Sequence, residues 1–551
     1  MSRRSASGTA GTPDAFGSAP APAPILLTGV RAWVAAGPAG AAGAGVDPRV
    51  ADAVLVRDGH IAWAGRAEEA PAGTGTEVFD ACGAVLLPGF VDGHAHVTET
   101  GRALASLDVT AVNGAHELLD AVARAAATAP AGARILGHGW DESAWADPRL
   151  PRPEELESAA GGREVFLSRV DVHAGLASAG LLARAGVGPD AALDESDHAA
   201  VRALATVTSD EETRSHQAVA LRHFASTGHS AVTEMAAPHV SGEADLRTLL
   251  EPRQDGELRP TVYAYWARLV AHEAQALAEM ASWGGALSGL GGDLSIDGSL
   301  GARTAALRAP YADAPHTSGE LLLEPAAIGA HLAACTLAGT QAAFHAIGDA
   351  GVDAALEGLR LAASAVGEER LRAARHRLEH VEGIDARGAL ELARYGVLAS
   401  VQPRFDELWG FDGDLYEQRL GAARAAALNP FGTLAAARVQ LALGSDTPVT
   451  GASPWLSVRA ALRHHSPEQR LAAVHAFEAH TVGGHAAARA AEGGRGTLAV
   501  GAPASLALWQ APDVGHWGQP STQAEAILAL AEVGEPACLL TLAEGAVLHR
   551  A

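Results

Sequence analysis

The sequence contains no lysine, so all 40 of its basic residues are arginine. This absence removes every side-chain amine from the chemistry that the chain can carry out. Cysteine is almost as scarce. The three cysteines are scattered along the chain, so we expect neither a disulfide framework nor a Cys-x-x-Cys metal site. Such cysteine usage is typical of the reducing cytoplasm, and we predict a cytoplasmic protein.

Charge and hydropathy argue against two further classes of protein. The formal net charge of −24 disfavours binding to nucleic acid and to anionic membranes. No uninterrupted apolar run is long enough to span a bilayer. Residues 1–24 are rich in Ala, Pro, Ser and Gly and lack the apolar segment of a signal peptide, so we expect a disordered tail. The expected partner is a small-molecule substrate, and the sequence is compatible with a homo-oligomer.

The order of apolar runs predicts two domains. Short runs separated by turn residues in 25–88 and 496–551 indicate a small β-sandwich-like domain shared by both chain ends. In 89–495, strand-like runs alternate with helical stretches, which is typical of an α/β fold and predicts a (β/α)8 TIM barrel. Two further strand-like runs belong to a predicted insertion at about 101–214, which folds over the barrel mouth. The eight predicted barrel strands are 90–97, 230–235, 261–266, 293–297, 341–345, 376–380, 397–401 and 440–446.

The segment His94-Ala95-His96 ends the first predicted barrel strand. Residues two apart in a strand point to the same face, so the two imidazoles converge on one point. Core packing explains such a pair poorly. A divalent metal explains it well, because neutral imidazole is a favoured ligand of zinc and similar ions.

Three other predicted strands end in side chains of the same kind. His345 closes the fifth strand, His380 the sixth and Asp446 the eighth. Taken alone, each has a simpler explanation, such as a hydrogen-bonded histidine or an aspartate in a turn. Functional residues of a TIM barrel lie at the carboxyl ends of its strands. The whole set therefore predicts one metal site at the barrel mouth.

These segments resemble the amidohydrolase superfamily, and within it the branch that contains N-substituted formamide deformylase. The resemblance implies a metal-dependent hydrolase that cleaves non-peptide carbon–nitrogen bonds of amides or N-substituted formamides with metal-activated water. It implies metal ligands at His94, His96, His345, His380 and Asp446, with Asp446 and His380 also catalytic. The matching stretches are LPGFVDGHAH (87–96), GWDES (139–143), DGSLGARTA (297–305), HAIGD (345–349), EH (379–380) and GSDTP (444–448).

The sequence departs from the superfamily at one position. Binuclear members commonly bridge their two ions with a carboxylated lysine near the end of the fourth strand, where this chain has Asp293. Either Asp293 bridges two ions directly, or the site holds one ion with His380 outside its ligand set. We favour one ion, and we expect it to be Zn²⁺.

Substrate contacts and the remaining histidines carry weaker signals. We predict substrate-binding roles for Trp140, Asp141 and Arg303, and we expect Gln402 to line the wall of the site. Histidines in alanine-rich helical surroundings near the end of the barrel are expected at the surface. They are His464, His465, His475, His480 and His485.

Two other functions stay open. A deaminase of a heterocyclic substrate would use the same metal site, and a single ion would favour it. An inactive scaffold homologue is disfavoured because all five ligand positions are present.

Overall fold

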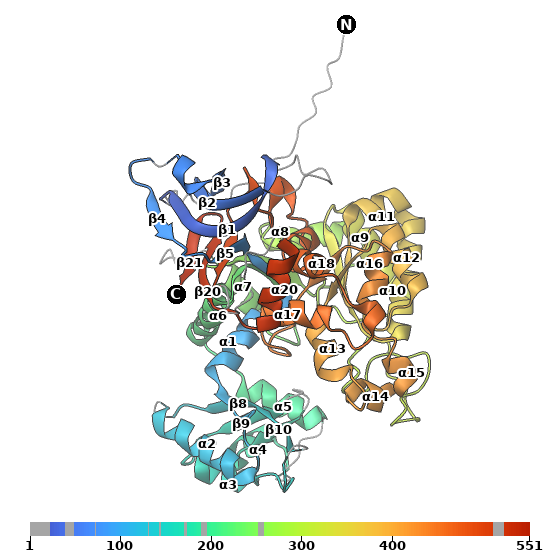
Figure 1. The fold of residues 1–551 in the computed structure, drawn as a ribbon. Helices are drawn as coiled ribbons and strands as arrows, with labels where there is room; N and C mark the ends of the chain where they lie inside the picture. Colours follow the sequence, from blue (N-terminus) through green and yellow to red (C-terminus); the bar gives the residue numbers. More distant parts are fainter. Residues whose placement is uncertain are drawn as a thin grey trace.

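The computed structural model describes residues 23–38, 49–71, 73–129, 132–142, 145–169, 174–188, 195–251, 258–510 and 523–551. These residues form a sheet from both chain ends, a barrel, and a lobe inserted after the first barrel helix (Figure 1). Residues 1–22 of the predicted tail lie outside the described residues. None of the described helices has the length and hydropathy that crossing a bilayer requires.

Both ends of the chain contribute to one sheet, which has nine strands in the described part of the protein. Strand β5 pairs antiparallel with β19, so segments more than 400 residues apart share one apolar core. This confirms the prediction of a β domain built from the two chain ends. Its strands are β1 (Ile25–Pro38), β2 (Arg49–Arg57), β3 (His60–Gly65), β4 (Glu77–Asp80), β5 (Val85–Pro88), β18 (Ala499–Val500), β19 (Leu506–Trp509), β20 (Cys538–Ala543) and β21 (Ala546–Arg550).

Within the described ranges, eight strands form the barrel, which confirms the predicted fold, and all their pairings are parallel. A parallel bridge between Ala95 and Thr447 joins the first and last strands and brings their carboxyl ends together. The strands are β6 (Phe90–Ala95), β11 (His229–Ala236), β12 (Thr261–Trp266), β13 (Leu287–Leu290), β14 (Gln341–Ala346), β15 (Arg377–His380), β16 (Leu398–Val401) and β17 (Leu441–Leu443).

The prediction of the fourth strand at 293–297 is wrong. The strand is β13, which ends at Leu290, and the next two residues, Gly291 and Gly292, adopt φ values of 118° and 84°. Residues other than glycine rarely adopt such φ values, so this glycine pair allows the chain to turn out of the sheet. Asp293 therefore lies in the loop beyond the carboxyl end of the strand.

Helices surround the barrel and extend its loops. The loop after β16 carries α13 (Pro403–Trp409), α14 (Leu415–Leu420) and α15 (Ala422–Ala425). The remaining barrel helices are α1 (Val97–Ala105), α6 (Asp210–Ser226), α7 (Glu243–Leu250), α8 (Glu273–Ser282), α9 (Pro325–Leu337), α10 (Asp349–Val366), α11 (Glu368–Ala374), α12 (Ala386–Tyr395), α16 (Phe431–Ala436), α17 (Pro454–Leu462), α18 (Ala473–Ala479), α19 (Val482–Ala487) and α20 (Gln523–Val533).

The inserted lobe has its own sheet and core. Its strands follow the order β10-β9-β8-β7, and the lobe projects from the barrel at the end of α1 (Figure 1). These elements lie within the predicted insertion at 101–214. They are β7 (Leu107–Asp108), α2 (Ala115–Thr128), β8 (Ile135–Trp140), α3 (Pro153–Ala159), β9 (Val165–Arg169), β10 (Gly175–Ala177), α4 (Ala179–Ala185) and α5 (Glu195–Ala205).

Three of the histidines predicted at the surface are buried, so that prediction is wrong for them. His480 donates from Nδ1 to the carbonyl of Val91, 2.9 Å away. Nδ1 of His485 lies 2.8 Å from the hydroxyl of Tyr263. His464 is also fully buried. These rings pack between the last helices and the barrel, so the alanine-rich sequence around them forms an interface and not an exposed face.

Candidate metal centre

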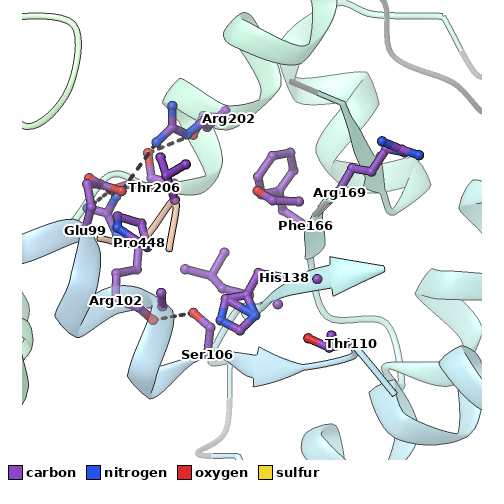
Figure 2. Close-up of a pocket in the computed structure, with 16 residues that line it drawn as sticks. Glu99, Arg102, Ser106, Thr110, His138, Phe166, Arg169, Arg202, Thr206 and Pro448 are labelled. Carbon is purple, nitrogen blue, oxygen red and sulfur yellow. Dashed lines mark hydrogen bonds and ion pairs between the residues drawn. The ribbon is translucent and has the colours of Figure 1, made fainter. Parts of the chain in front are cut away.

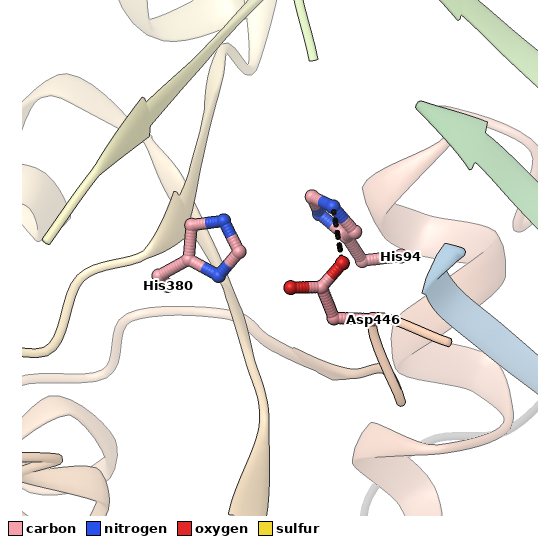
Figure 3. Close-up of side chains that lie close together, drawn as sticks. All are labelled: His94, His380 and Asp446. Atoms are coloured by element: carbon pink, nitrogen blue, oxygen red, sulfur yellow. Dashed lines mark ion pairs between the residues drawn. The ribbon is translucent and has the colours of Figure 1, made fainter. Parts of the chain in front are cut away.

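Six side chains meet where the barrel strands end. Five of them are buried, and His345 is half-buried. Figure 3 shows the imidazoles of His94 and His380 and the carboxylate of Asp446 around one space. The cluster consists of His94, His96, Asp293, His345, His380 and Asp446. The structure therefore brings together all five sequence-predicted ligands and the predicted bridge residue.

Two carboxylates face the pair of histidines on β6. The Oδ1 and Oδ2 atoms of Asp293 lie 3.4 Å from Nε2 of His94 and 3.1 Å from Nε2 of His96. Oδ1 of Asp446 lies 3.4 Å and 3.2 Å from the same two nitrogen atoms. Both carboxylates thus approach both imidazoles through the Nε2 edge, the edge that would bind a metal.

The potential ligand atoms fall into overlapping groups of three, each with its atoms within 4.8 Å of one another. Asp293 joins His94 and His96 in one group, and it joins His345 and His380 in another. A third group contains His94, His380 and Asp446. Asp293 thus belongs both to the group with His94 and His96 and to the group with His345 and His380.

The electrostatics of the cluster favour a cation. Burial opposes protonation of His94, but the carboxylates of Asp293 and Asp446 raise its pKa to about 10. The pKa of His96 is also raised well above its usual value, against burial, by the same two carboxylates. Nε2 of His94 and Oδ1 of Asp293 are buried and form no hydrogen bond with the described residues. Unpartnered polar atoms in a buried site with two ionised carboxylates fit a bound divalent ion.

A second layer of hydrogen bonds fixes the histidine tautomers. Nδ1 of His94 lies 3.0 Å from Oε2 of Glu379, which leaves Nε2 free for a metal. Glu379 is held by two hydrogen bonds of 2.6 and 2.9 Å from the guanidinium of Arg377. Nδ1 of His380 lies 2.9 Å from Oε1 of Gln402, which likewise leaves its Nε2 free. Carboxylate and amide partners of this kind orient ligands and raise their basicity.

His345 has the opposite arrangement. Its Nε2 atom lies 3.1 Å from the carbonyl oxygen of Gly298, which can only accept a hydrogen bond. Nε2 therefore carries the proton, and Nδ1 is the atom left for a metal. The loop after β13 thus both supplies Asp293 and orients His345.

The backbone around two of the ligands is held in an uncommon conformation. His380 and Asp446 have φ values of 69° and 54°, which residues other than glycine rarely adopt. Asp92, which is fully buried, accepts a 2.6 Å hydrogen bond from the hydroxyl of Ser445 and thereby fixes the loop before Asp446. Burial raises the pKa of Asp92 to about 6. The surrounding contacts thus hold these ligands in place despite their uncommon backbone conformation, as is common at functional sites.

The predicted substrate-binding residues lie apart from this cluster. Trp140 is 3 % exposed, belongs to the core of the lobe, and donates from Nε1 to the carbonyl of Leu167. Asp141 forms an ion pair of 2.9 Å with Arg169 in the same lobe. Arg303 pairs with Asp313 at 2.8 Å. Their substrate-binding roles stay predictions, and Trp140 is already occupied in packing.

Sequence reasoning missed several residues that support the ligands. Arg377, Glu379 and Asp92 lie within three residues of a ligand, so their proximity in the sequence was an available signal. Glu234 gave no such signal. Its buried carboxylate at the end of β11 accepts a 2.6 Å hydrogen bond from the backbone of Val97, the first residue of α1. Burial raises the pKa of Glu234 to about 7.

Comparison with known proteins identifies the family. A family model described as "Amidohydrolase family" matches residues 77–549. The chain belongs to the amidohydrolase family. It is therefore a hydrolase that acts on carbon–nitrogen bonds other than peptide bonds. Membership of the family supports a divalent metal, and the cluster of histidines and aspartates is the candidate site for it.

Individual relatives agree with this membership of the amidohydrolase family. The chain is 28% identical over 482 residues to Protein LONG AFTER FAR-RED 3 of Arabidopsis thaliana, and the aligned region covers 80% of each chain. It is 32% identical over 142 residues to N-substituted formamide deformylase of Arthrobacter pascens, which covers 25% of this chain and 26% of the relative. A solved metal-dependent hydrolase of Pyrococcus horikoshii, described as uncharacterized, is 24% identical, with a TM-score of 0.70 over 90% of this chain and 99% of that one. This last likeness shows the fold.

Proposed function

We propose that this amidohydrolase holds two divalent ions, bridged by Asp293, and hydrolyses an amide or N-substituted formamide. The observation that carries the proposal is the position of Asp293, whose carboxylate belongs to the ligand groups on both sides of the site. One ion would be held by His94, His96, Asp293 and Asp446, and the other by Asp293, His345 and His380. This proposal replaces the single ion that the sequence favours, and nitrogen and carboxylate donors of this kind suit Zn²⁺.

Bound ions of this kind lower the pKa of water to about 7 and polarise a carbonyl group. The residues of the chain supply the proton transfer. Although burial opposes ionisation, His94 and His96 lower the pKa of Asp446, so this carboxylate is ionised at neutral pH. Asp446 can therefore accept a proton from the attacking water as its oxygen adds to the carbonyl carbon.

The same proton completes the reaction. Asp446 returns it to the nitrogen as the carbon–nitrogen bond breaks, which gives a carboxylic acid and an amine. Gln402 orients His380, and Glu379 orients His94, so both imidazoles keep their free nitrogen atoms available to hold the ions. For a formamide substrate, the products are formate and the amine.

The formamide preference rests on the matching stretches of the sequence and on the partial relative whose name states that activity. The test combines elemental analysis of the purified protein with a hydrolysis screen of N-formyl and N-acyl amines. We expect two zinc ions per chain and release of formate and amine. Release of ammonia from a heterocycle, with no hydrolysis of any amide, would overturn the proposal in favour of a deaminase.

A further inference from the structure

A cavity lies between the barrel and the inserted lobe (Figure 2). Its volume is about 200 Å³. On the barrel side it is lined by α1, which begins directly after His96, and by Pro448 and Val449, which follow Asp446 closely. Residues of β8, β9 and α5 line the lobe side. The cavity is therefore formed by continuations of the two segments that carry ligands.

The walls of this cavity suit one end of a small molecule. Leu136 and Phe166 from the lobe and Val449 from the barrel provide apolar surface. Pockets that enclose whole small ligands usually measure about 300–1,000 Å³. A cavity of about 200 Å³ fits a ring or a short chain, with the rest of the molecule outside.

Two guanidinium groups reach the cavity from its two sides, Arg102 from α1 and Arg202 from α5 (Figure 2). Both turn to Glu99. Nη1 of Arg102 lies 2.6 Å from Oε1, and Nη2 of Arg202 lies 3.4 Å from Oε2. Among the described residues that line the cavity, Glu99 is the one acid. The remaining arginine of the lining, Arg169, pairs with Asp141 and Glu142.

Within the described part of the chain, Arg102 and Arg202 retain donors without a hydrogen-bond partner. The Nε atom of Arg102 is buried and has no hydrogen-bond partner among the described residues. Among the described residues, Glu99 is the side chain that Arg202 approaches in the cavity, at 3.4 Å. The planar fork of a guanidinium matches a carboxylate, and hydrogen bonds between the two charged groups are strong. The cavity thus offers charge and donors to an acidic ligand group.

The distance to the metal centre suits a single substrate that spans both sites. Arg102 follows His96 by six residues, which corresponds to about 9 Å along a helix. His239, in the loop after β11, lies within electrostatic range of residues of both sites. Partial burial lowers its pKa, and its electrostatic neighbours include Asp293 and His345 of the metal centre and Arg202 of the cavity.

We propose that this cavity binds a carboxylate of the substrate, carried on a short apolar or aromatic stem, and that Arg102 and Arg202 recognise it. The assignment rests on the proposed amide hydrolysis and narrows its substrates to acidic amides. The scissile bond lies at the metal centre, the stem lies against Phe166 and Val449, and the carboxylate accepts hydrogen bonds from the two arginines.

The test uses a matched pair of formamides, 4-(formamidomethyl)benzoate and its methyl ester. The wild-type enzyme should hydrolyse the acid with a kcat/KM about tenfold or more above that of the ester. A tenfold ratio corresponds to the free energy that one hydrogen bond to a charged group contributes. Arg202→Gln should reduce this preference through a higher KM for the acid, because it removes one of the two arginines that bind the carboxylate. The control is Arg149→Gln, an exposed lobe arginine that pairs with Glu155 outside the cavity and should change neither substrate.

A binding measurement separates this proposal from the proposed reaction. Titration calorimetry of the metal-loaded protein with 4-(aminomethyl)benzoate and with its methyl ester requires no turnover and no variant. Tighter binding of the acid by about tenfold or more supports the cavity even if neither formamide is hydrolysed. Equal binding of acid and ester overturns it, as does an Arg202→Gln variant that keeps the full preference for the acid.

Discussion

The carboxylate of Asp293 lies 3.1 Å from the Nε2 atom of His96, although the two residues follow different barrel strands. A lysine needs a long side chain to reach that position from its strand. Asp293 reaches it because Gly291 and Gly292 turn the chain out of β13 and carry the backbone of the next residue towards the site. The turn at the glycine pair thus brings the short side chain of Asp293 within reach of the histidines.

Replacement of Asp293 should reduce the metal content. In Asp293→Ala, we expect the metal content to fall from two ions per chain to one or fewer, because both ligand groups lose a shared member. Elemental analysis of the purified variant measures this. The control is Asp353→Ala, an exposed aspartate that pairs with Arg308. Two ions per chain in Asp293→Ala would contradict the bridge.

Replacement of Asp446 by asparagine should separate binding from catalysis. An amide keeps a metal-binding oxygen but cannot accept the proton that the reaction requires. We expect Asp446→Asn to retain most of its metal and to lose about 10²–10⁴-fold in kcat. Steady-state kinetics and metal analysis on one preparation give both quantities. Near-normal turnover would assign the proton transfer to another group.

Glu379 should affect both metal affinity and folding. It accepts the Nδ1 proton of His94 and neutralises the buried guanidinium of Arg377. In Glu379→Gln, we expect metal affinity to fall by about 10–100-fold. The loss of the buried ion pair should lower the free energy of unfolding by about 3–5 kcal/mol. Chelator competition and denaturant unfolding measure the two effects. A variant with unchanged metal affinity would show that Glu379 does not act through His94.

The buried histidines should make the fold sensitive to acid. Burial lowers the pKa of His480 to about 4, from 6.5 in an exposed histidine. Below pH 6.5 the unfolded chain binds a proton that the folded chain excludes, so stability is full above pH 6.5 and falls as the pH drops towards 4. The slope is at most about 1.4 kcal/mol per pH unit for each such residue.

Thermal unfolding between pH 7.5 and 4.5 tests this effect. His480→Asn keeps a donor for the carbonyl of Val91 but does not titrate, so its stability should depend less on pH than that of the wild type. His475→Asn serves as the control, because His475 is exposed. Identical pH profiles for the wild type and His480→Asn would show that burial of this ring does not cause the acid sensitivity.

Much of the site could be predicted from the sequence because the ligands end strands. The His94-Ala95-His96 spacing and the strand-end positions of His345, His380 and Asp446 follow from strand periodicity and barrel geometry. The placement of Asp293 did not follow in the same way. The segment 293–297 reads as a strand by its alternation, and β13 is only four residues long and contains a glycine.

Long-range packing explains the other differences. His480 and His485 have alanine-rich neighbours, and only the packing of α18 and α19 against the barrel shows that these rings are buried. Trp140 lies in a stretch that matches the superfamily, yet the lobe uses its side chain for its own core. The residues next to a side chain in the sequence do not show which distant element of the fold will pack over it.

The inserted lobe leaves and rejoins the barrel at almost the same place, since α1 packs against α6 and a side chain at Gly101 would collide with the carbonyl oxygen of His216. Both junctions are therefore anchored in the barrel and independent of what lies between them. Such a lobe is a replaceable module. Selection can exchange or reshape it, and with it the wall that faces the substrate, while the strands, the ligands and the chemistry of the barrel stay as they are.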